Sequence, residues 1–430
     1  RRLAEQVISQ LRAAGYEALL AGGCVRDLLL GRDPIDFDVA TAAPASAVQR
    51  LFPRTVPVGV QFGVVLVLQE DARIEVATFR TDGRYLDHRH PAEVRFGDAR
   101  ADAERRDFTI NGMFCDPATG EVIDYVGGLA DLGARVIGAI GDPHARFDED
   151  RLRLLRAIRF AARLDYEIEP RTFAAIRELA SGITSIAWER IGDEIVKILL
   201  GPGAARGFEL LDQTGLLDAV LPEIAAQRGV TQPPDAHPEG EVWTHTKLCL
   251  RHLSAVDAGE ALALGVLLHD VSKPECRAEQ GDGRVTFYGH CERGAEVAAA
   301  VVQRLRRSRA VVERVSWLVK NHLRHVQAPQ MRVATLKRLL AEPAIDDLLA
   351  LARIDVLAGS GDLSSVDFCL GKRRELSRED VRPAPLLRGR DLVALGLRPG
   401  PVFRELLDSA FDAQLEGHLR TAEEARAWAR

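Results

Sequence analysis

The hydrophobic pattern changes along the chain, and the first 140 residues mix two periods. A helical spacing occupies the start of residues 1–21, and an apolar run leads from there into Gly22 and Gly23. A short amphipathic run follows the glycines, and another helix is expected over 44–52. Strands are predicted at 35–39, at 64–68 paired with 73–79, and at 121–125 paired with 135–138. This mixture predicts an α/β head.

After about residue 145 the pattern turns helical and stays so, with one short strand expected near 285–287. The helix from Phe147 to Arg163 is read as continuous, and a Pro-rich stretch at 231–238 is read as a linker. We therefore expect an α+β multidomain protein with a long all-helical part. The expected division is a head at 1–140, a helical neck and body at 141–230, a further helical domain at 231–360 and a helical tail at 361–430.

Composition narrows the class of protein. The 430 residues are 47% hydrophobic and 28% charged, as in ordinary globular proteins. No apolar run reaches membrane-spanning length and no signal peptide is visible, although the start at Arg1 without Met suggests that a short leader is missing. Six scattered cysteines fit a reducing cytoplasm. The net charge of −6 means that any nucleic-acid surface must be local, and no obligate protein partner is evident.

The double glycine and the acidic strand after it carry the first candidate chemistry. Glycines let a backbone approach a ligand closely, and the helix behind them directs free N–H groups at it. Asp36 and Asp38, two apart on the expected strand, share a face and repel each other unless a cation lies between them. This favours Mg²⁺ and a nucleoside triphosphate, with Glu75 as a third carboxylate. The alternative interpretation of the same residues is a surface turn beside a solvent-exposed strand.

The predicted helix from Phe147 places a row of charged residues on one half of its surface. Asp150 leads this row, and Arg153, Arg156, Arg159 and Arg163 follow. A solvated basic face is the plain alternative, but such faces usually mix signs. An aspartate accepts hydrogen bonds and an arginine donates them, so the two together match the pairing edges of cytosine and adenine and reject uracil and guanine. The other arginines would hold phosphates.

Five ordered motifs resemble the bacterial family of class II CCA tRNA nucleotidyltransferases and poly(A) polymerases, over roughly residues 15–225. They are Gly22-Gly23-x-Val25-Arg26-Asp27 with Asp36-x-Asp38, Arg105-Arg106-Asp107-Phe108-Thr109-Ile110-Asn111, Asp124-Tyr125-x-Gly127-Gly128, Glu149-Asp150-x-x-Arg153, and Glu189-Arg190-Ile191-x-x-Glu194. The family implies a polymerase-β-like head and two-metal transfer of nucleotides.

The resemblance also assigns roles. Asp36 and Asp38 would bind catalytic Mg²⁺ with Glu75 beside them, and Asp150 and Arg153 would select the incoming base. Other residues expected to bind the nucleotide are Gly22, Gly23, Arg26, Arg106, Asp107, Asn111, Arg156 and Arg159. The polar stretch 80–92, read as a mobile loop, carries Asp87-x-Arg89 and resembles the flexible loop of enzymes that add the final A.

A second constellation is rich in histidine. An adjacent His269-Asp270 pair after a buried helix offers ligands for a divalent transition metal, whereas a single histidine is more often structural. The order of residues resembles the HD phosphohydrolase superfamily, which implies that His245, His269, Asp270 and Asp355 bind one divalent transition metal or Mg²⁺. His290 and His322 would extend the site to two metals. A relic domain that helps to hold RNA is the alternative.

The first hypothesis is therefore a cytoplasmic, template-independent CTP/ATP:tRNA nucleotidyltransferase that builds or repairs the tRNA 3′ CCA end. Its partners would be the tRNA 3′ end, CTP and ATP, and the HD domain would add a phosphohydrolase activity. A poly(A) polymerase or an enzyme that adds only A on the same fold is the nearest alternative. An HD phosphohydrolase whose head merely binds RNA is the alternative of another class, which the intact Asp36-x-Asp38 pair disfavours.

Overall fold

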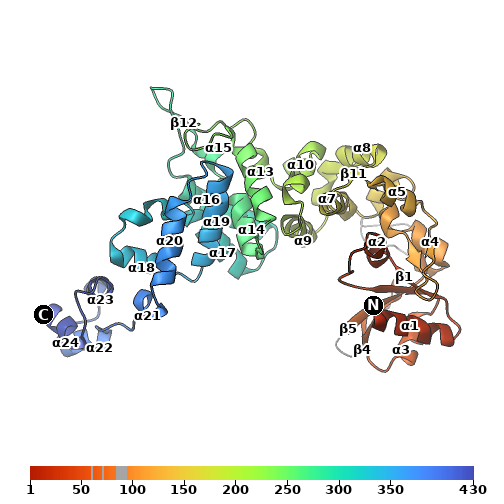
Figure 1. Ribbon diagram of the computed structural model, residues 1–430, viewed down its shortest axis with the longest axis horizontal. Coiled ribbons are helices and arrows are strands. Elements are labelled where there is room, and N and C mark those ends of the chain that lie inside the picture. Colours follow the sequence, from red (N-terminus) through yellow and green to blue (C-terminus); the bar gives the residue numbers. More distant parts are fainter. Residues whose placement is uncertain (60–61, 70–71, 84–93) are drawn as a thin grey trace. The chain divides into compact units, whose positions relative to one another are not determined.

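The computed structural model describes residues 1–59, 62–69, 72–83 and 94–430. They form two compact units, Arg1–Pro222 and Glu223–Arg430 (Figure 1). The first unit holds a mixed sheet followed by helices, and the second is almost entirely helical. The expected α+β class is therefore confirmed.

Seven strands of the described residues form the sheet of the first unit, in the order β3-β4-β5-β2-β1-β8-β9. Neighbours are antiparallel except β2 and β5, which are parallel. The central strand β1 is buried at all four positions, which explains its uninterrupted apolar sequence. The strands are β1 (Ala18–Ala21), β2 (Asp38–Thr41), β3 (Thr55–Gly59), β4 (Val64–Gln69), β5 (Ala72–Thr78), β8 (Phe114–Cys115) and β9 (Val122–Ile123).

Short helices accompany this sheet. Helix α1 (Arg2–Ala13) buries Ala4, Val7, Ile8 and Leu11, which lie on one face, and it contacts β1 and α3 (Ala45–Leu51). The remaining helices before residue 140 are α2 (Gly23–Leu29), α4 (Ala99–Glu104), the 3₁₀ turn η2 (Thr109–Asn111) and α5 (Gly128–Ala134). The predicted helices at the start of the chain, after the glycines and over 44–52 are thus confirmed, as is the pairing of 64–68 with 73–79.

Two strand predictions are wrong. The strand expected over 35–39 begins only at Asp38, because Ala21 is the last β1 residue that pairs with it before the chain turns at Gly22. Residues 121–125 and 135–138 do not pair with each other, since α5 leads the chain away between them. Instead β9 pairs with β8, and β10 (Val136–Ile137) pairs in parallel with β11 (Glu167–Ile168).

The stretch 80–92 begins as a strand rather than a loop. Strand β6 (Arg80–Asp82) pairs with β7 (Val94–Phe96). The rest of the expected mobile loop, including Asp87-x-Arg89, lies outside the described residues.

The helix expected from Phe147 is interrupted. Helix α6 (Pro143–Glu149) ends before Asp150, whose backbone is extended, and α7 (Leu152–Leu164) follows. A carboxylate oxygen of Asp150 accepts a hydrogen bond from the N–H of Leu152 at 3.1 Å, as side chains at helix starts do. The predicted apolar half of α7 is buried. The next elements are α8 (Pro170–Leu179), the 3₁₀ helix η3 (Ala180–Ser185), α9 (Trp188–Leu199), α10 (Ala204–Thr214), α11 (Leu216–Val220) and α12 (Pro222–Ala225).

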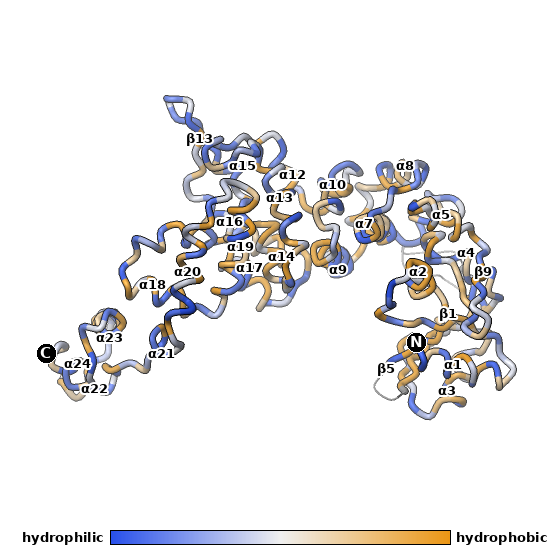
Figure 2. The backbone as a smooth tube through the Cα atoms, in the orientation of Figure 1, coloured by the Kyte–Doolittle hydropathy of each residue, from blue (hydrophilic) through white to orange (hydrophobic). Residues whose placement is uncertain are grey.

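The second unit is built around α14 (Glu260–Leu268), which is hydrophobic along its length (Figure 2). It contacts α13 (Val242–Leu253), α16 (His290–Arg304), α17 (Arg309–Asn321) and α19 (Ile345–Ala358). The other elements are α15 (Lys273–Cys276), β12 (Ala278–Glu279), β13 (Val285–Thr286), η4 (Arg324–Gln330), α18 (Val333–Leu340), α20 (Ser364–Glu375), α21 (Arg378–Val381), α22 (Gly389–Ala394), α23 (Pro401–Leu415) and α24 (Ala422–Trp428). The short strand expected near 285–287 is present as β13.

The last three helices share a small core of their own. It includes Leu387, Leu392 and Ala410. Over the described part of the chain, no helix combines the length and the apolar character that crossing a membrane requires.

Candidate active site and metal centre

A pocket of 680 Å³ lies in the first unit, where β1, β2 and β5 meet η2 and α7. Of the residues that the sequence assigns to catalysis or nucleotide binding, it brings together all but Arg163, which lies in the last turn of α7 and does not line the pocket. The residues that line it are Gly22, Gly23, Arg26, Asp36, Asp38, Glu75, Arg106, Asp107, Asn111, Asp150, Arg153, Arg156 and Arg159.

Three carboxylates form the acidic edge of this pocket. Asp38 and Glu75 are register partners on the parallel strands β2 and β5, and Asp36 precedes Asp38 by two residues. Burial, together with the charges of Glu75 and Asp36, raises the pKa of Asp38 to about 6. A cluster whose members oppose each other's ionisation fits a divalent cation, because oxygen-ligated Mg²⁺ would remove that cost.

Gly22 is required by its conformation and by its neighbour. Its φ of 74° lies in the left-handed region, and a Cβ there would lie 2.8 Å from Nη1 of Arg106. Arg106 is held in place, since it donates to Asp102 Oδ2 at 2.9 and 3.2 Å and to the carbonyl of Asn111 at 3.3 Å. Because Gly22 has no side chain, the guanidinium of Arg106 has room to face the pocket.

A continuous chain of buried polar groups crosses the floor of the pocket. Arg26 donates to Asp27 Oδ1 at 2.7 and 2.8 Å and to Asn111 Oδ1 at 2.7 Å. The amide of Asn111 donates to Asp107 at 3.2 Å, and Arg156 donates to the other oxygen of Asp107 at 2.6 and 2.9 Å. Burial opposes the charge of Asp107, but Arg156 and Asn111 lower its pKa to about 2. The floor is thus ionised and preorganised at neutral pH.

Asp150 and Arg153 both line the pocket, yet each is paired elsewhere. Asp150 accepts hydrogen bonds from Arg190 of α9 at 2.9 and 3.2 Å. Arg153 donates to Glu149 at 2.6 Å and to the carbonyls of Arg146 and Arg105. The expectation that Asp150 shares a helix with the arginines is wrong, because the break between α6 and α7 falls at this residue. Sequence reasoning missed Arg190 as a site residue, although its motif was visible.

Phe160 of α7 was also missed. Its ring has three guanidinium groups around it, with centroid distances of 5.4 Å to Arg26, 5.3 Å to Arg156 and 4.3 Å to Arg159. The edge of Phe108 packs against it in a T-shaped pair. An aromatic face attracts cations, so this ring holds three positive groups together that would otherwise repel each other.

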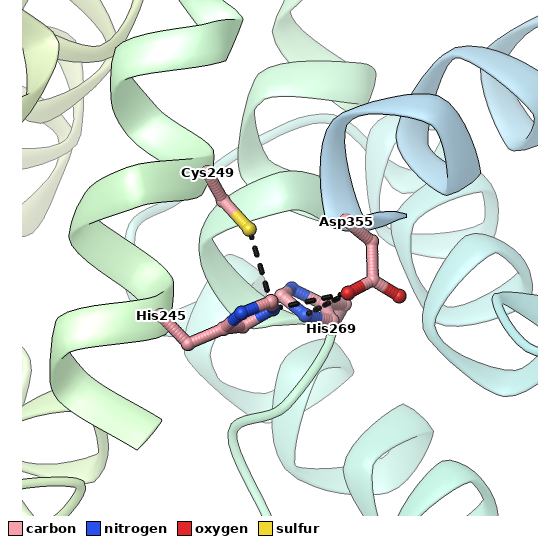
Figure 3. A group of neighbouring side chains, drawn as sticks. All are labelled: His245, Cys249, His269 and Asp355. Carbon is pink, nitrogen blue, oxygen red and sulfur yellow. Dashed lines mark hydrogen bonds and ion pairs between the residues drawn. The ribbon is translucent and has the colours of Figure 1, made fainter. Parts of the chain in front are cut away.

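The histidine constellation assembles in the second unit (Figure 3). His245 lies on α13, His269 and Asp270 lie at the C-terminal end of α14, and Asp355 lies on α19. Nε2 of His245 is 3.0 Å from Asp355 Oδ1, and Nε2 of His269 is 3.2 Å from Asp270 Oδ2 and 3.9 Å from Asp355 Oδ1. The four residues predicted to share one metal therefore converge.

The remaining two histidines face the same carboxylate. Nε2 of His290 and of His322 lie 3.7 and 3.8 Å from Asp270 Oδ1. Burial lowers the pKa of His322 to about 4, whereas His269 and Lys273 overcome the burial of Asp270 and hold its pKa well below the usual value. Burial opposes the charge of His245 and His269 as well, but Cys249 and Asp355 raise the pKa of His245, and Asp270 and Asp355 raise the pKa of His269. A metal that binds here would displace these protons, because metal binding requires neutral imidazoles and ionised carboxylates.

The hydrogen bonds of these rings support metal binding. Nδ1 of His269, His290 and His322 each donates to a backbone carbonyl at 2.7–2.9 Å, and Nδ1 of His245 contacts Glu239 Oε1 at 2.6 Å. Their Nε2 lone pairs therefore point inward. Within the described chain, Nε2 of His269 and both oxygens of Asp270 accept no hydrogen bond of regular geometry. Buried acceptors that face one another fit a cation between them.

Four neighbours of this centre were not predicted. His237 belongs to the Pro-rich stretch predicted as a linker and Glu239 follows that stretch directly, with Glu239 Oε1 2.8 Å from Nδ1 of His237. Lys273, three residues after Asp270, forms an ion pair with it at 2.7 Å. Cys249, four residues after His245, completes a cluster of possible ligands. The spacing of four residues between His245 and Cys249 on α13 is the sequence feature that could have identified Cys249.

Three family models match the chain. Residues 18–138 match the poly A polymerase head domain, 165–228 match the probable RNA and SrmB-binding site of polymerase A, and 241–360 match the HD domain. The expected polymerase-β-like head, helical body and HD domain are confirmed by these matches and by the mixed sheet.

Curated relatives and solved structures are similar to parts or all of the chain. A CCA-adding enzyme of Enterococcus faecalis is 48% identical over 199 residues, 46% of this chain and 49% of that protein. One of Anoxybacillus flavithermus is 43% identical over 228 residues, 53% and 57% of the two chains. The chain thus spans about half the length of these relatives. The crystal structure of the Bacillus stearothermophilus CCA-adding enzyme in complex with CTP matches 99% of this chain and 95% of its own, with 28% identity and a TM-score of 0.73.

Proposed function

Because the chain belongs to the nucleotidyltransferase family of poly(A) polymerases and CCA-adding enzymes, we propose that it adds CCA to the 3′ end of tRNA from CTP and ATP. The observation that carries this proposal is one pocket in which the acidic edge and the Asp150–Arg153 pair lie together. The similarity of the chain to a CCA-adding enzyme whose structure was solved with CTP supports the choice of substrates.

The residues divide the work as follows. Asp36, Asp38 and Glu75 would hold Mg²⁺ in the expected two-metal site, where the bound ions would supply positive charge against the triphosphate and the attacking hydroxyl. The 3′ hydroxyl of the tRNA attacks the α-phosphate, and pyrophosphate leaves.

The polar floor selects the nucleotide. Arg106 and Asp107 position the ribose, and Arg156 and Arg159 bind phosphate oxygens. Asp150 accepts from the exocyclic amino group of cytosine or adenine, and Arg153 donates to the neighbouring ring nitrogen. The protein itself therefore takes the place of a template.

For the second unit we propose a metal-dependent phosphohydrolase. The observation that favours it is the convergence of His245, His269, Asp270 and Asp355, where Nε2 of His269 and Oδ1 of Asp270 are buried and accept no hydrogen bond from the described residues. His290 and His322 extend the same centre. Six free cysteines fit work in the reducing cytoplasm.

The test incubates the full chain with tRNA lacking CCA and with each labelled nucleoside triphosphate in turn. Incorporation of C, C and A, followed by arrest, is the expected result. Long A tails on unrelated RNA would identify a poly(A) polymerase, and addition of A alone to tRNA ending in CC would identify an A-adding enzyme.

A further inference from the structure

A cysteine lies among the ligands of the histidine centre. Cys249 follows His245 by one turn of α13, and its Sγ lies 3.4 Å from Nε2 of His245 (Figure 3). The ligand atoms of Cys249, His245, His269 and Asp355 all lie within 4.8 Å of one another. Cys249 and His245 are both fully buried.

The spacing of these atoms matches a coordination sphere. With metal–nitrogen distances of about 2.0–2.1 Å and metal–sulfur distances of about 2.3 Å, ligands in a tetrahedron lie roughly 3.3–3.6 Å apart. The Cys249–His245 separation of 3.4 Å and the His245–Asp355 separation of 3.0 Å are close to this range. The His269–Asp355 separation of 3.9 Å is longer, and 3.4 Å also suits an S–H···N hydrogen bond. The spacing therefore permits a ligand role for the thiol without requiring it.

An independent feature points to the same position. Nδ1 of His269 donates to the carbonyl of Val266 at 2.9 Å, so the proton of this imidazole is used there. Nε2 of His269 accepts no hydrogen bond from the described residues, although the side chain is 1% exposed. In the neutral imidazole that a metal binds, the lone pair of this buried nitrogen is therefore directed at the space that Cys249, His245 and Asp355 also face.

We propose that Cys249 is a further ligand of this metal, so that one sulfur joins the nitrogens of His245 and His269 and the oxygens of Asp270 and Asp355. This inference rests on the proposed metal centre of the second unit. Binding releases the thiol proton to solvent, and the thiolate makes the centre prefer a thiophilic ion such as Zn²⁺ over Mg²⁺. The all-oxygen edge of the first unit has the opposite preference.

X-ray absorption of the full chain with one equivalent of Zn²⁺ tests this assignment without any substitution. One sulfur at about 2.3 Å beside nitrogen and oxygen ligands is expected. A shell of nitrogen and oxygen alone would refute the role of Cys249 and leave the metal centre standing. Failure of Zn²⁺ to bind in the second unit would overturn the centre and this inference together.

Substitutions identify which cysteine supplies the sulfur. With Co²⁺ as probe, thiolate-to-metal charge transfer should be lost in Cys249→Ser and Cys249→Ala. This charge transfer should persist in two control variants, Cys291→Ser and Cys369→Ser. Cys291 is the neighbour of His290, and Cys369 is an equally buried thiol outside the cluster. Zn²⁺ affinity should fall by at least about tenfold, since even the loss of a group that only supports a ligand costs about 10–100-fold. Charge transfer that survives in Cys249→Ala would overturn the proposal.

Discussion

The carboxylate of Asp150 is held by the guanidinium of Arg190, through hydrogen bonds of 2.9 and 3.2 Å. Asp150 lies in the break between α6 and α7, and Arg190 lies near the start of α9. The residue proposed to read the incoming base is therefore oriented from a segment that the family match assigns to RNA binding.

Removal of this support should impair base selection more than folding. A hydrogen bond to a charged group contributes about 1.5–3 kcal/mol, so Arg190→Ala should lower kcat/KM for CTP and ATP by roughly ten- to a hundredfold. Incorporation of UTP or GTP should rise relative to CTP. Arg177→Ala, an exposed arginine of α8, is the matched control. Unchanged discrimination in Arg190→Ala would mean that Asp150 needs no such support.

The two proposed metal sites should fail separately. Asp38→Ala removes a ligand whose cation supplies several kcal/mol of charge stabilisation, so nucleotide addition should fall by about a thousandfold or more. Asp270→Ala should abolish phosphoester hydrolysis and metal retention in the second unit. Each variant is assayed for both activities, and Asp33→Ala, exposed in the loop before β2, serves as the control. Loss of addition in Asp270→Ala would show that the sites depend on each other.

A methyl group at Gly22 should displace Arg106. The backbone of Gly22, with φ 74° and ψ −133°, lies in a region that costs an L residue about 1–3 kcal/mol, and the new Cβ would lie 2.8 Å from Nη1 of Arg106. Because a shift of about 1 Å in a site costs about a hundredfold in rate, Gly22→Ala should lose activity on this scale. Gly31→Ala has the same sign of φ but no atom within 4 Å of its Cβ. Gly31→Ala should lose stability and keep activity, and an equal loss in both would contradict the role of Arg106.

Phe160 should govern nucleotide affinity through the arginines around it. Each guanidinium over the ring contributes about 0.5–2 kcal/mol, so Phe160→Leu should raise KM for CTP and ATP by about tenfold. Phe160→Tyr retains the aromatic face and should therefore keep the KM of the parent protein. Phe208→Leu, a fully buried phenylalanine elsewhere in the first unit, measures the cost of the core change alone. Equal KM values in Phe160→Leu and Phe208→Leu would refute the role of the ring.

Acid should reveal the contribution of Asp107. Its folded pKa of about 2 lies below the unfolded value of 3.8, so its stabilisation is present above pH 4 and is lost as the pH falls toward 2. Asp107→Asn should therefore be less stable than the parent by about 2 kcal/mol at pH 5, and this difference should shrink at pH 2.5. Urea unfolding followed by Trp188 fluorescence, with the other three tryptophans replaced by phenylalanine, reports on the first unit. A difference that does not depend on pH would contradict this assignment.

Short motifs predicted the composition of the pocket because each one stays local. Gly22 lies just before α2 and Asp38 is the first residue of β2. The short segment between them keeps the two residues close in space. No local spacing links His269 with Asp355, and it was the resemblance to the HD superfamily that predicted their shared metal. The head, the helical body and the helical second unit followed from the change in hydrophobic period.

Partners that depend on tertiary packing could not be read in this way. The break at Asp150 arises from a local hydrogen bond to the N–H of Leu152 that competes with the helical pattern. Arg190 is 40 residues from Asp150, and no periodicity links them. Glu239 directly follows a stretch whose prolines predict a loop, yet its carboxylate contacts His245. Cys249 and Phe160 looked like ordinary core residues because their chemistry depends on what surrounds them.

The parallel pairing of β10 with β11 bears on how this protein can be divided for expression. The match to the head ends at residue 138, immediately after β10, but the strand that completes β10 lies at 167–168. A fragment that stops at the family boundary would expose an unpaired strand edge and lose α7 with its arginines. The smallest recombinant piece worth testing for nucleotide binding therefore extends past Ile168, and to Leu199 if Arg190 is to accompany it.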